Sequence, residues 1–213
     1  PILYVWWWTY SLLPIVICRL KGIKCIVAGA FHYETPLMSG TDFVRRSWLY
    51  KLLIGLSLRA AHMNIFVSSC EYDAVVKNLP VNNPKLVYHG IDTDLYSPAE
   101  SADTKFSDVS RTPQLLCISW MEKNNIERKC IREIVEALEI LYLQGVEVNL
   151  LLVGRPGPGF SEFREFVATK SCAKNIQFKG HVTEAEKIHL LRTSTMYVSP
   201  TLYEGFGKIG RAH

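Results

Sequence analysis

The sequence has no Cys-x-x-Cys pair, no cysteine and histidine at zinc-finger spacing, and little excess charge of either sign. A chain of 213 residues buries a core without disulfide bonds, so we expect reduced, mostly buried thiols in a cytosolic compartment. The 24 basic residues exceed the 20 acidic ones by only four, which excludes a nucleic-acid-binding polycation and an acidic disordered tail. The six cysteines are Cys18, Cys25, Cys70, Cys117, Cys130 and Cys172.

A long uninterrupted apolar run is also missing. Residues 2–18 are uncharged and are followed by basic residues, as in a signal anchor. Thr, Ser and Pro interrupt them, however, and a membrane span needs about 20 apolar residues. The alternative is a buried strand over residues 2–6 and a buried helix with Pro14 in its first turn. This alternative is favoured because Gly22 ends the helix and residues 23–28 resemble a second strand.

Strand and helix patterns alternate through the rest of the chain. An amphipathic helix is expected where apolar residues recur every three or four positions, and Ser68 with Glu71 and Thr183 with Glu186 are typical of capping boxes. This alternation predicts an α/β protein with two doubly wound, Rossmann-like domains. The expected strands are residues 64–67, 85–88, 114–119, 146–153, 175–178 and 196–199. The expected helices are residues 45–61, 68–79, 131–141 with Gly145 closing it, 160–170 and 183–192.

A polar stretch without periodicity separates the two sets of elements. It runs from residue 93 to residue 113, and Pro98 and Pro113 flank its central part. We therefore predict a first domain over residues 1–98, a linker over 99–113 and a second domain over 114–213.

Ligands of open parallel sheets bind at the carboxyl ends of the strands, so the segments that follow the strands are the candidate sites. The turn at residues 154–159 is glycine-rich, but it has neither the Gly-x-Gly-x-x-Gly spacing nor the Gly-Lys-Ser/Thr of a P-loop. The candidate segments are His32 with Glu34, and residues 89–92, 120–129, 154–159, 180–182 and 199–207.

Several of these segments together resemble one protein family. Ser199 and Pro200 followed by Tyr-Glu-Gly-Phe-Gly at residues 203–207 resemble the Pro-Ser-x-x-Glu-Gly-Phe-Gly signature of family 4 (group 1) retaining glycosyltransferases, which have the GT-B fold. In matching order, residues 88–98 resemble the interdomain Asn-Gly-Val-Asp stretch, with His89 in place of Asn. The segments at 125–129, 152–154 and 178–182 resemble the family's Arg-Lys-Gly, Val-Gly-x-Gly-Pro and Phe-x-Gly-x-Val stretches.

The resemblance implies two incomplete Rossmann-like domains in a chain cut at both ends. Residues 1–98 are similar to the C-terminal part of the acceptor-side domain, and residues 114–213 to the first part of the donor-binding domain. We expect Pro1 not to be the native start, and the tail at 208–213 departs from the family pattern.

The family also implies roles for individual residues. His32 and Glu204 are the expected catalytic residues beside the donor sugar. Arg128 and Lys129 would grip the donor diphosphate, whose growing negative charge in the transition state needs cations or N–H donors. Gly205, Phe206 and Gly207 resemble the loop whose backbone approaches sugar and phosphate, and Val182 sits where main-chain groups meet the base. From the residues alone, the basic pair also suits a solvated helix start, Glu204 a loop carboxylate and His32 a structural histidine.

Two departures from the family pattern bear on activity. Ser119 and Trp120 replace the usual Gly-Arg, which removes one phosphate contact, and Ala212 stands where a second Glu would hold the donor ribose. The alternative function is therefore a nucleotide-sugar-binding module without catalysis.

The resemblance implies an enzyme that moves a sugar from a nucleotide-diphosphate sugar to an acceptor hydroxyl with retention, in glycan, glycolipid or envelope polysaccharide synthesis. No cofactor or metal is expected beyond the donor co-substrate. The expected partners are this donor and a carbohydrate or lipid-linked acceptor, and not nucleic acid. We expect a cytoplasmic protein, either free or peripheral at the inner membrane face.

Trp48 with the basic side chains of helix 45–61 suits docking on anionic lipid, and the alternative is a solvated basic face. These side chains are Arg45, Arg46, Lys51 and Arg59.

Overall fold

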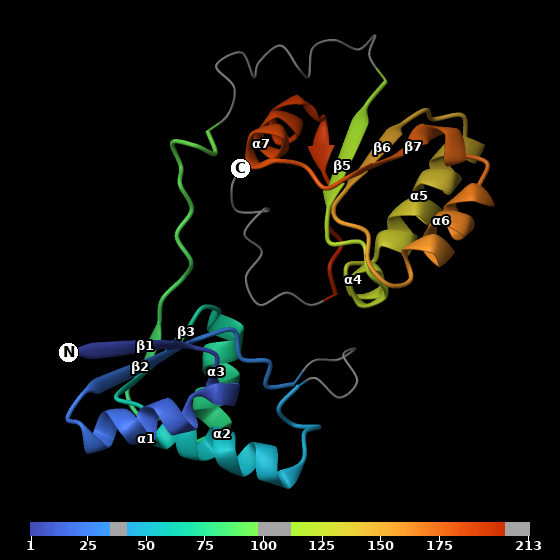
Figure 1. Ribbon diagram of the computed structural model, residues 1–213. Coiled ribbons are helices and arrows are strands. Elements are labelled where there is room, and N and C mark those ends of the chain that lie inside the picture. The colour runs from blue at the N-terminus through green and yellow to red at the C-terminus, as the bar shows by residue number, and fades with distance from the viewer. Residues whose placement is uncertain (35–41, 98–111, 203–213) are drawn as a thin grey trace. The chain divides into compact units, whose positions relative to one another are not determined.

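The computed structural model describes residues 1–34, 42–97 and 112–202 (Figure 1). These residues form two compact units, Pro1–Ile91 and Asp92–Leu202, and each contains a four-stranded sheet in which every strand pair is parallel. The strand and helix alternation that predicted two Rossmann-like domains is confirmed.

The first unit has strands in the order β1-β2-β3-β4. Because each strand lies beside its predecessor and parallel crossovers are right-handed, the helices cover one face of the sheet. Ile15, Ile54 and Val75, one from each helix, accordingly share one buried cluster with Val27 and Phe66 of the strands. The elements are β1 (Ile2–Trp6), α1 (Leu12–Leu20), β2 (Lys24–Gly29), α2 (Trp48–Ala60), β3 (Met63–Phe66), α3 (Ser69–Asn78) and β4 (Pro84–Leu86).

The uncharged run at the start of the chain forms a strand and a short helix. Strand β1 is followed by a 3-10 turn at Trp8–Tyr10 and by α1, with Pro14 in the first turn of that helix. Among the described residues, no helix is long and apolar enough to span a membrane. The strand and helix expected over residues 2–18 are therefore confirmed, but the expectation that both are buried is wrong. Most of β1 is exposed, and only Ile15 and Cys18 of α1 are buried.

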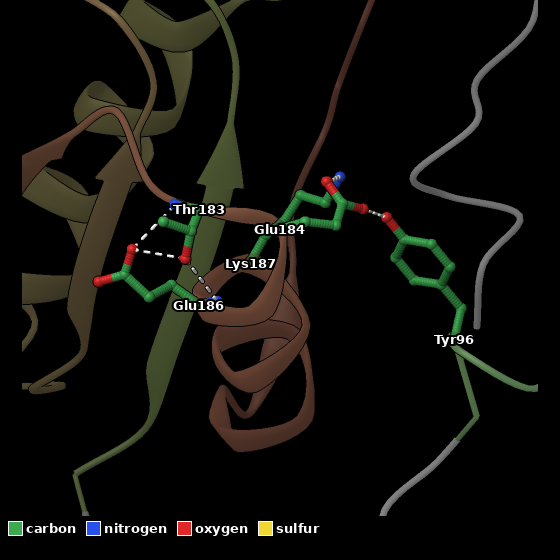
Figure 2. Close-up of polar contacts among 5 residues, drawn as sticks. All are labelled: Tyr96, Thr183, Glu184, Glu186 and Lys187. Atoms are coloured by element: carbon green, nitrogen blue, oxygen red, sulfur yellow. Dashed lines mark hydrogen bonds and ion pairs between the residues drawn. The ribbon is translucent and has the colours of Figure 1, made fainter.

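The two expected capping boxes have different outcomes. The Thr183 side chain accepts a hydrogen bond from the Glu186 N–H, and the Glu186 carboxylate accepts one from the Thr183 N–H at 2.8 Å (Figure 2). The box at Ser68 is wrong, because the Ser68 side chain makes no cap hydrogen bond within the described part of the chain and Glu71 bonds to another segment instead. Identical sequence spacing thus gives a local bond only where no tertiary donor competes.

The second unit has strands in the order β7-β6-β5-β8. The chain leaves β5 towards β6 and β7, and then crosses to the opposite side of β5, so the crevice between β5 and β8 is a topological switch point. Helix α4 was not expected from the sequence. The elements are β5 (Gln114–Ile118), α4 (Lys123–Arg128), α5 (Ile131–Leu143), β6 (Asn149–Val153), α6 (Phe160–Ala168), β7 (Ile176–Gly180), α7 (Glu184–Thr193) and β8 (Met196–Tyr197), with a 3-10 turn at Ala173–Asn175.

Residues 92–97 are held against α7. The Arg192 guanidinium donates to the carbonyl oxygen of Ser97 at 3.0 Å. The Tyr96 hydroxyl donates to the Glu184 carboxylate, which also pairs with Lys187 at 2.7 Å (Figure 2). The Asp92 carboxylate accepts the N–H groups of Asp94 and Leu95, which closes the turn that starts the segment. The domain ranges 1–98, 99–113 and 114–213 stay predictions, since residues 98–111 lie outside the described part.

All six cysteines are free thiols, and only Cys70 is exposed. Burial raises the pKa of Cys25, Cys117 and Cys172 to about 11. A thiol with so high a pKa is not ionised at neutral pH and is a poor nucleophile. The expectation of mostly buried thiols is confirmed, and their role is packing.

Glu139 on α5 provides a test of how the second unit depends on pH. Its carboxylate accepts the N–H groups of Cys172 and Ser171 at 3.0 Å each, and these bonds lower the pKa of Glu139 from 4.5 to about 2. A depressed folded-state pKa adds stability above pH 4.5, and this contribution is lost as pH falls towards 2. We expect Glu139→Gln to lower the urea midpoint at pH 7 and the difference from wild type to shrink below pH 4.5. Glu136→Gln, at an exposed position of the same helix, is the control, and an equal effect there would contradict this assignment.

Candidate functional site

The predicted cation pair lies near the switch point of the second unit. Arg128 ends α4 and Lys129 follows it, and both side chains are half-buried. Asn125 holds the pair, since its side-chain oxygen accepts from the Arg128 guanidinium and its carbonyl oxygen accepts the Lys129 N–H, each at 2.9 Å. Burial raises the pKa of the Cys117 thiol in β5, and the positive charge of Lys129 lowers it. The Lys129 ammonium group therefore lies near the carboxyl end of that strand.

The chain returns to the same place after β8. The Leu202 N–H donates to the carbonyl oxygen of Arg128 at 3.0 Å, so the residue before the Tyr-Glu-Gly-Phe-Gly motif is tied to the cation pair. Segments about 75 positions apart in the sequence therefore meet, as a switch point requires. The predicted residues Glu204, Gly205, Phe206 and Gly207 lie outside the described residues.

The glycine-rich turn at residues 154–159 is bound to the loop that follows β5. The Met121 N–H donates to the Arg155 carbonyl at 2.9 Å, the Gly157 N–H to the Met121 carbonyl at 2.8 Å and the Lys123 N–H to the Pro158 carbonyl at 2.9 Å. These N–H groups serve internal bonds and are not offered to a phosphate. The turn's role is to fix the start of α4, and hence the cation pair at its other end.

Gly154 is the tightest point of this contact. Its φ of +150° favours glycine, and a Cβ there would lie 1.6 Å from the Ser119 carbonyl oxygen. The Gly154 N–H also donates to the Gly180 carbonyl at 2.8 Å. The sequence pattern marked this glycine as part of a ligand-binding turn, whereas the structure gives it a packing role.

Val182 lies between β7 and α7. Its side chain packs against a buried cluster that includes Leu116, Leu151 and Leu190. The side chain is thus partly buried, and the family resemblance implies a contact through the main chain at this position.

An apolar groove of the second unit does not contain the cation pair among its lining residues. It has a volume of about 480 Å³ and is lined mainly by aliphatic side chains of α5 and by residues that follow β8. An apolar lining cannot compensate the desolvation of a diphosphate. This groove is therefore not a candidate for binding a diphosphate.

His32 lies just past the carboxyl end of β2 in the first unit. Its carbonyl oxygen accepts the Phe43 N–H at 2.8 Å, and its half-buried ring lines a small pocket of about 90 Å³ together with Trp7, Phe31 and Tyr50. Aromatic side chains form most of the pocket's wall. The histidine thus shares a small pocket with several aromatic residues.

Glu71 lies beside His32, although the sequence predicted it to be part of a capping box with Ser68. Its side chain is 2% exposed, with one carboxylate oxygen 3.4 Å from His32 Nδ1 and the other accepting the Phe31 N–H at 3.0 Å. A carboxylate beside Nδ1 favours the tautomer with the proton on that nitrogen. The sequence did contain a signal for this contact. The helix of the expected capping box and the candidate His32 both follow strands of one parallel sheet, so both begin at the same edge of it.

The comparisons with known proteins come from sequence and from structure. Residues 121–209 match the family model described as glycosyl transferases group 1, which covers most of the second unit. No curated protein sequence matches the chain significantly. Solved structures match almost the whole chain, at low sequence identity. The chain has a GT-B fold.

Three of these structures illustrate the likeness. Sucrose-phosphate synthase from Thermosynechococcus elongatus has a TM-score of 0.79 at 16% identity, over 100% of this chain and 53% of its own. HepE of Anabaena, in complex with UDP-glucose, has a TM-score of 0.72 at 14% identity, over 97% and 55%. A UDP-forming α,α-trehalose-phosphate synthase from Burkholderia xenovorans has a TM-score of 0.68 at 14% identity, over 99% and 55%. The chain thus spans about half the length of these GT-B proteins.

The contact at Gly154 predicts a large loss of stability on substitution. Gly154→Ala places a Cβ against backbone, which cannot move aside as a flexible side chain can, so we expect destabilisation above about 3 kcal/mol by urea unfolding. Gly145→Ala is the matched control, since Gly145 also has a positive φ but has open space around it. Its cost should stay at about 1–2 kcal/mol. Equal effects of the two substitutions would contradict the proposed clash.

The Glu71 contact predicts the tautomer of His32. In nitrogen-15 NMR of the histidine-labelled chain, we expect the Nδ1–H form in wild type and a mixture of tautomers in Glu71→Gln, because the amide also offers a donor. Replacing the buried charged acceptor should also cost about 1–3 kcal/mol of folding stability. Glu34→Gln, an exposed carboxylate two positions from His32, should change neither. An unaltered tautomer in Glu71→Gln would show that Glu71 does not orient the ring.

Proposed function

We propose that the protein to which this chain belongs transfers a sugar from a nucleotide-diphosphate sugar to an acceptor hydroxyl with retention of configuration. The observation that carries the proposal is the cation pair Arg128 and Lys129 near the switch point, tied through Leu202 to the segment that leads into Glu204. Support also comes from the group 1 match over residues 121–209 and from the GT-B fold.

The basic pair suits the leaving group of this reaction. When the bond between the anomeric carbon and the donor phosphate breaks, negative charge grows on the nucleoside diphosphate. Cations fixed before the reaction lower the energy of this charge without reorganisation. Lys129 serves as a point charge and Arg128, already oriented by Asn125, as a hydrogen-bonding fork. We propose that these side chains act without a metal ion.

Three further contacts complete the proposed donor site. Glu204 would bond to hydroxyl groups of the donor sugar. Gly205, Phe206 and Gly207 would bring their backbone close to sugar and phosphate, and at the two glycines a Cβ would obstruct the approach. The main chain at Val182 would meet the base. Glu204 and His32 are then the side chains that we propose to act beside the donor sugar.

His32 is the proposed acceptor-side residue. Its ring, whose Nδ1 lies 3.4 Å from the Glu71 carboxylate, would lie beside the donor sugar, as the family resemblance implies. We propose front-face transfer, in which the departing diphosphate itself takes the acceptor proton. Incoming and outgoing oxygens then share one face of the anomeric carbon, which gives retention without a covalent enzyme intermediate.

The proposed partners follow from this chemistry. HepE is described in complex with UDP-glucose and the trehalose-phosphate synthase as UDP-forming, so a uridine diphosphate sugar is the first donor to test. The acceptor is a carbohydrate or a lipid-linked carbohydrate. Six free thiols support a reducing cytoplasmic compartment.

Binding of UDP to this chain tests the donor site. We expect Lys129→Ala to weaken UDP binding roughly 10- to 100-fold in isothermal titration calorimetry, since hydrogen bonds to charged groups contribute about 1.5–3 kcal/mol. Lys123→Ala removes an equal charge from the exposed start of the same helix and should leave the affinity unchanged. Wild-type affinity in Lys129→Ala would remove Lys129 from the site. UDP binding by the longer parent protein without sugar transfer or donor hydrolysis would favour the alternative, a non-catalytic nucleotide-sugar-binding module.

A further inference from the structure

Helix α2 is apolar on two opposite faces. Ile54, Ser57 and Leu58 point into the core and are buried. Leucines at four other positions, spaced three or four apart, are each 41–50% exposed, and Trp48 at the start of the helix is 75% exposed. The expected amphipathic helix with one apolar face is therefore an incomplete description. The exposed leucines are Leu49, Leu52, Leu53 and Leu56.

Helix α1 carries a second exposed apolar stripe beside the first. The two helices are neighbours (Figure 1), and the Arg19 guanidinium of α1 donates to the Ala60 carbonyl of α2 at 2.8 Å. In the 3-10 turn before α1, the Thr9 hydroxyl lies 3.2 Å from the Tyr50 hydroxyl of α2. We call the two stripes together the α1–α2 surface. Its α1 members are Leu13, Val16, Ile17 and Leu20, the last of them 82% exposed.

Charge around the α1–α2 surface is predominantly positive. Neither residues 1–33 nor residues 43–70 contain an Asp or Glu, whereas they contain seven Lys and Arg residues. Two acidic residues lie between the stretches: Asp42 is buried and bonds to Arg45 at 2.5 Å, and Glu34 is exposed. The basic residues are Arg19, Lys21, Lys24, Arg45, Arg46, Lys51 and Arg59.

These features restrict what can cover the surface. A helix that is apolar all round is normally buried, and a contiguous exposed apolar patch marks an interaction site. A two-fold dimer would bring the same patch of each subunit together and so oppose like charges. An anionic bilayer has the complementary chemistry, because its acyl boundary accepts leucines, its interface accepts tryptophan, and its headgroups attract lysine and arginine.

We propose that the α1–α2 surface docks on a membrane containing anionic phospholipid, with both helices in the plane of the interface and the leucines at the acyl boundary. The docking uses exposed side chains on the outer sides of two helices and does not span the bilayer. It goes beyond sugar transfer and needs none of the donor-site residues.

Co-sedimentation of the 213-residue chain with vesicles tests the docking. We expect binding to phosphatidylcholine vesicles containing about one third phosphatidylglycerol, little binding to phosphatidylcholine alone, and weaker binding at high salt. Each cation removed by Lys51→Gln or Arg59→Gln should lower the partition coefficient about fivefold, and the double variant Leu49→Ser with Leu53→Ser should abolish binding. These leucines are exposed, so the far-UV circular dichroism should stay that of wild type.

Matched variants in the second unit separate docking from general stickiness. Leu143→Ser replaces a leucine that is 70% exposed on α5, and Arg164→Gln replaces an exposed cation on α6. Both should bind vesicles as wild type does. Equal losses in these controls, equal binding to neutral vesicles, or a concentration-dependent dimer without vesicle binding would each overturn the proposal. UDP affinity is measured independently, so failure of docking is distinguishable from failure of the donor site.

Discussion

The approach of Gly154 to the Ser119 carbonyl oxygen is the constraint on which the proposed donor site depends. It brings the turn after β6 against the loop after β5, and backbone hydrogen bonds then join Met121, Arg155 and Gly157. The joined loops set the start of α4, whose other end carries Arg128 and Lys129. Positions of the two cations are thus determined by a contact that no ligand needs to touch, which is how a rigid scaffold prepares a binding site.

A buried charge has the corresponding role in the first unit. The Glu71 carboxylate is almost completely buried, and burial of a charged group without partners is costly. Bonds to the Phe31 N–H and to His32 compensate it and join the end of β2 to the start of α3. The histidine is therefore oriented by the same contact that satisfies the carboxylate, so its position is part of the folding of the unit.

Periodicity and turn residues predict most of this fold, because apolar spacing reports directly on which residues are buried. The sequence patterns give a wrong prediction where a contact between residues far apart in the chain determines the structure. Glu71 and Glu186 have the same spacing from a cap residue, yet Glu71 bonds to a segment 40 positions away that no local pattern reveals. Helix α4 has only six residues, too few for a period to show. At the candidate site, motif resemblance singled out His32 and the basic pair, whose roles stay proposals, while the packing of Gly154 against Ser119 is evident only from the structure.

The two proposals together narrow the acceptor. Up to residue 91 the chain has nine basic and four acidic residues, and two of those acidic side chains, Asp42 and Glu71, are buried. If the proposed docking occurs, attraction to an anionic bilayer acts on the unit that carries His32. An acceptor reached by that histidine while α1 and α2 lie in the interface is most readily supplied from the bilayer, because diffusion within the membrane keeps a lipid-linked sugar at the docking plane. A freely water-soluble acceptor gains nothing from docking, so vesicle-dependent stimulation of transfer separates the two acceptor classes.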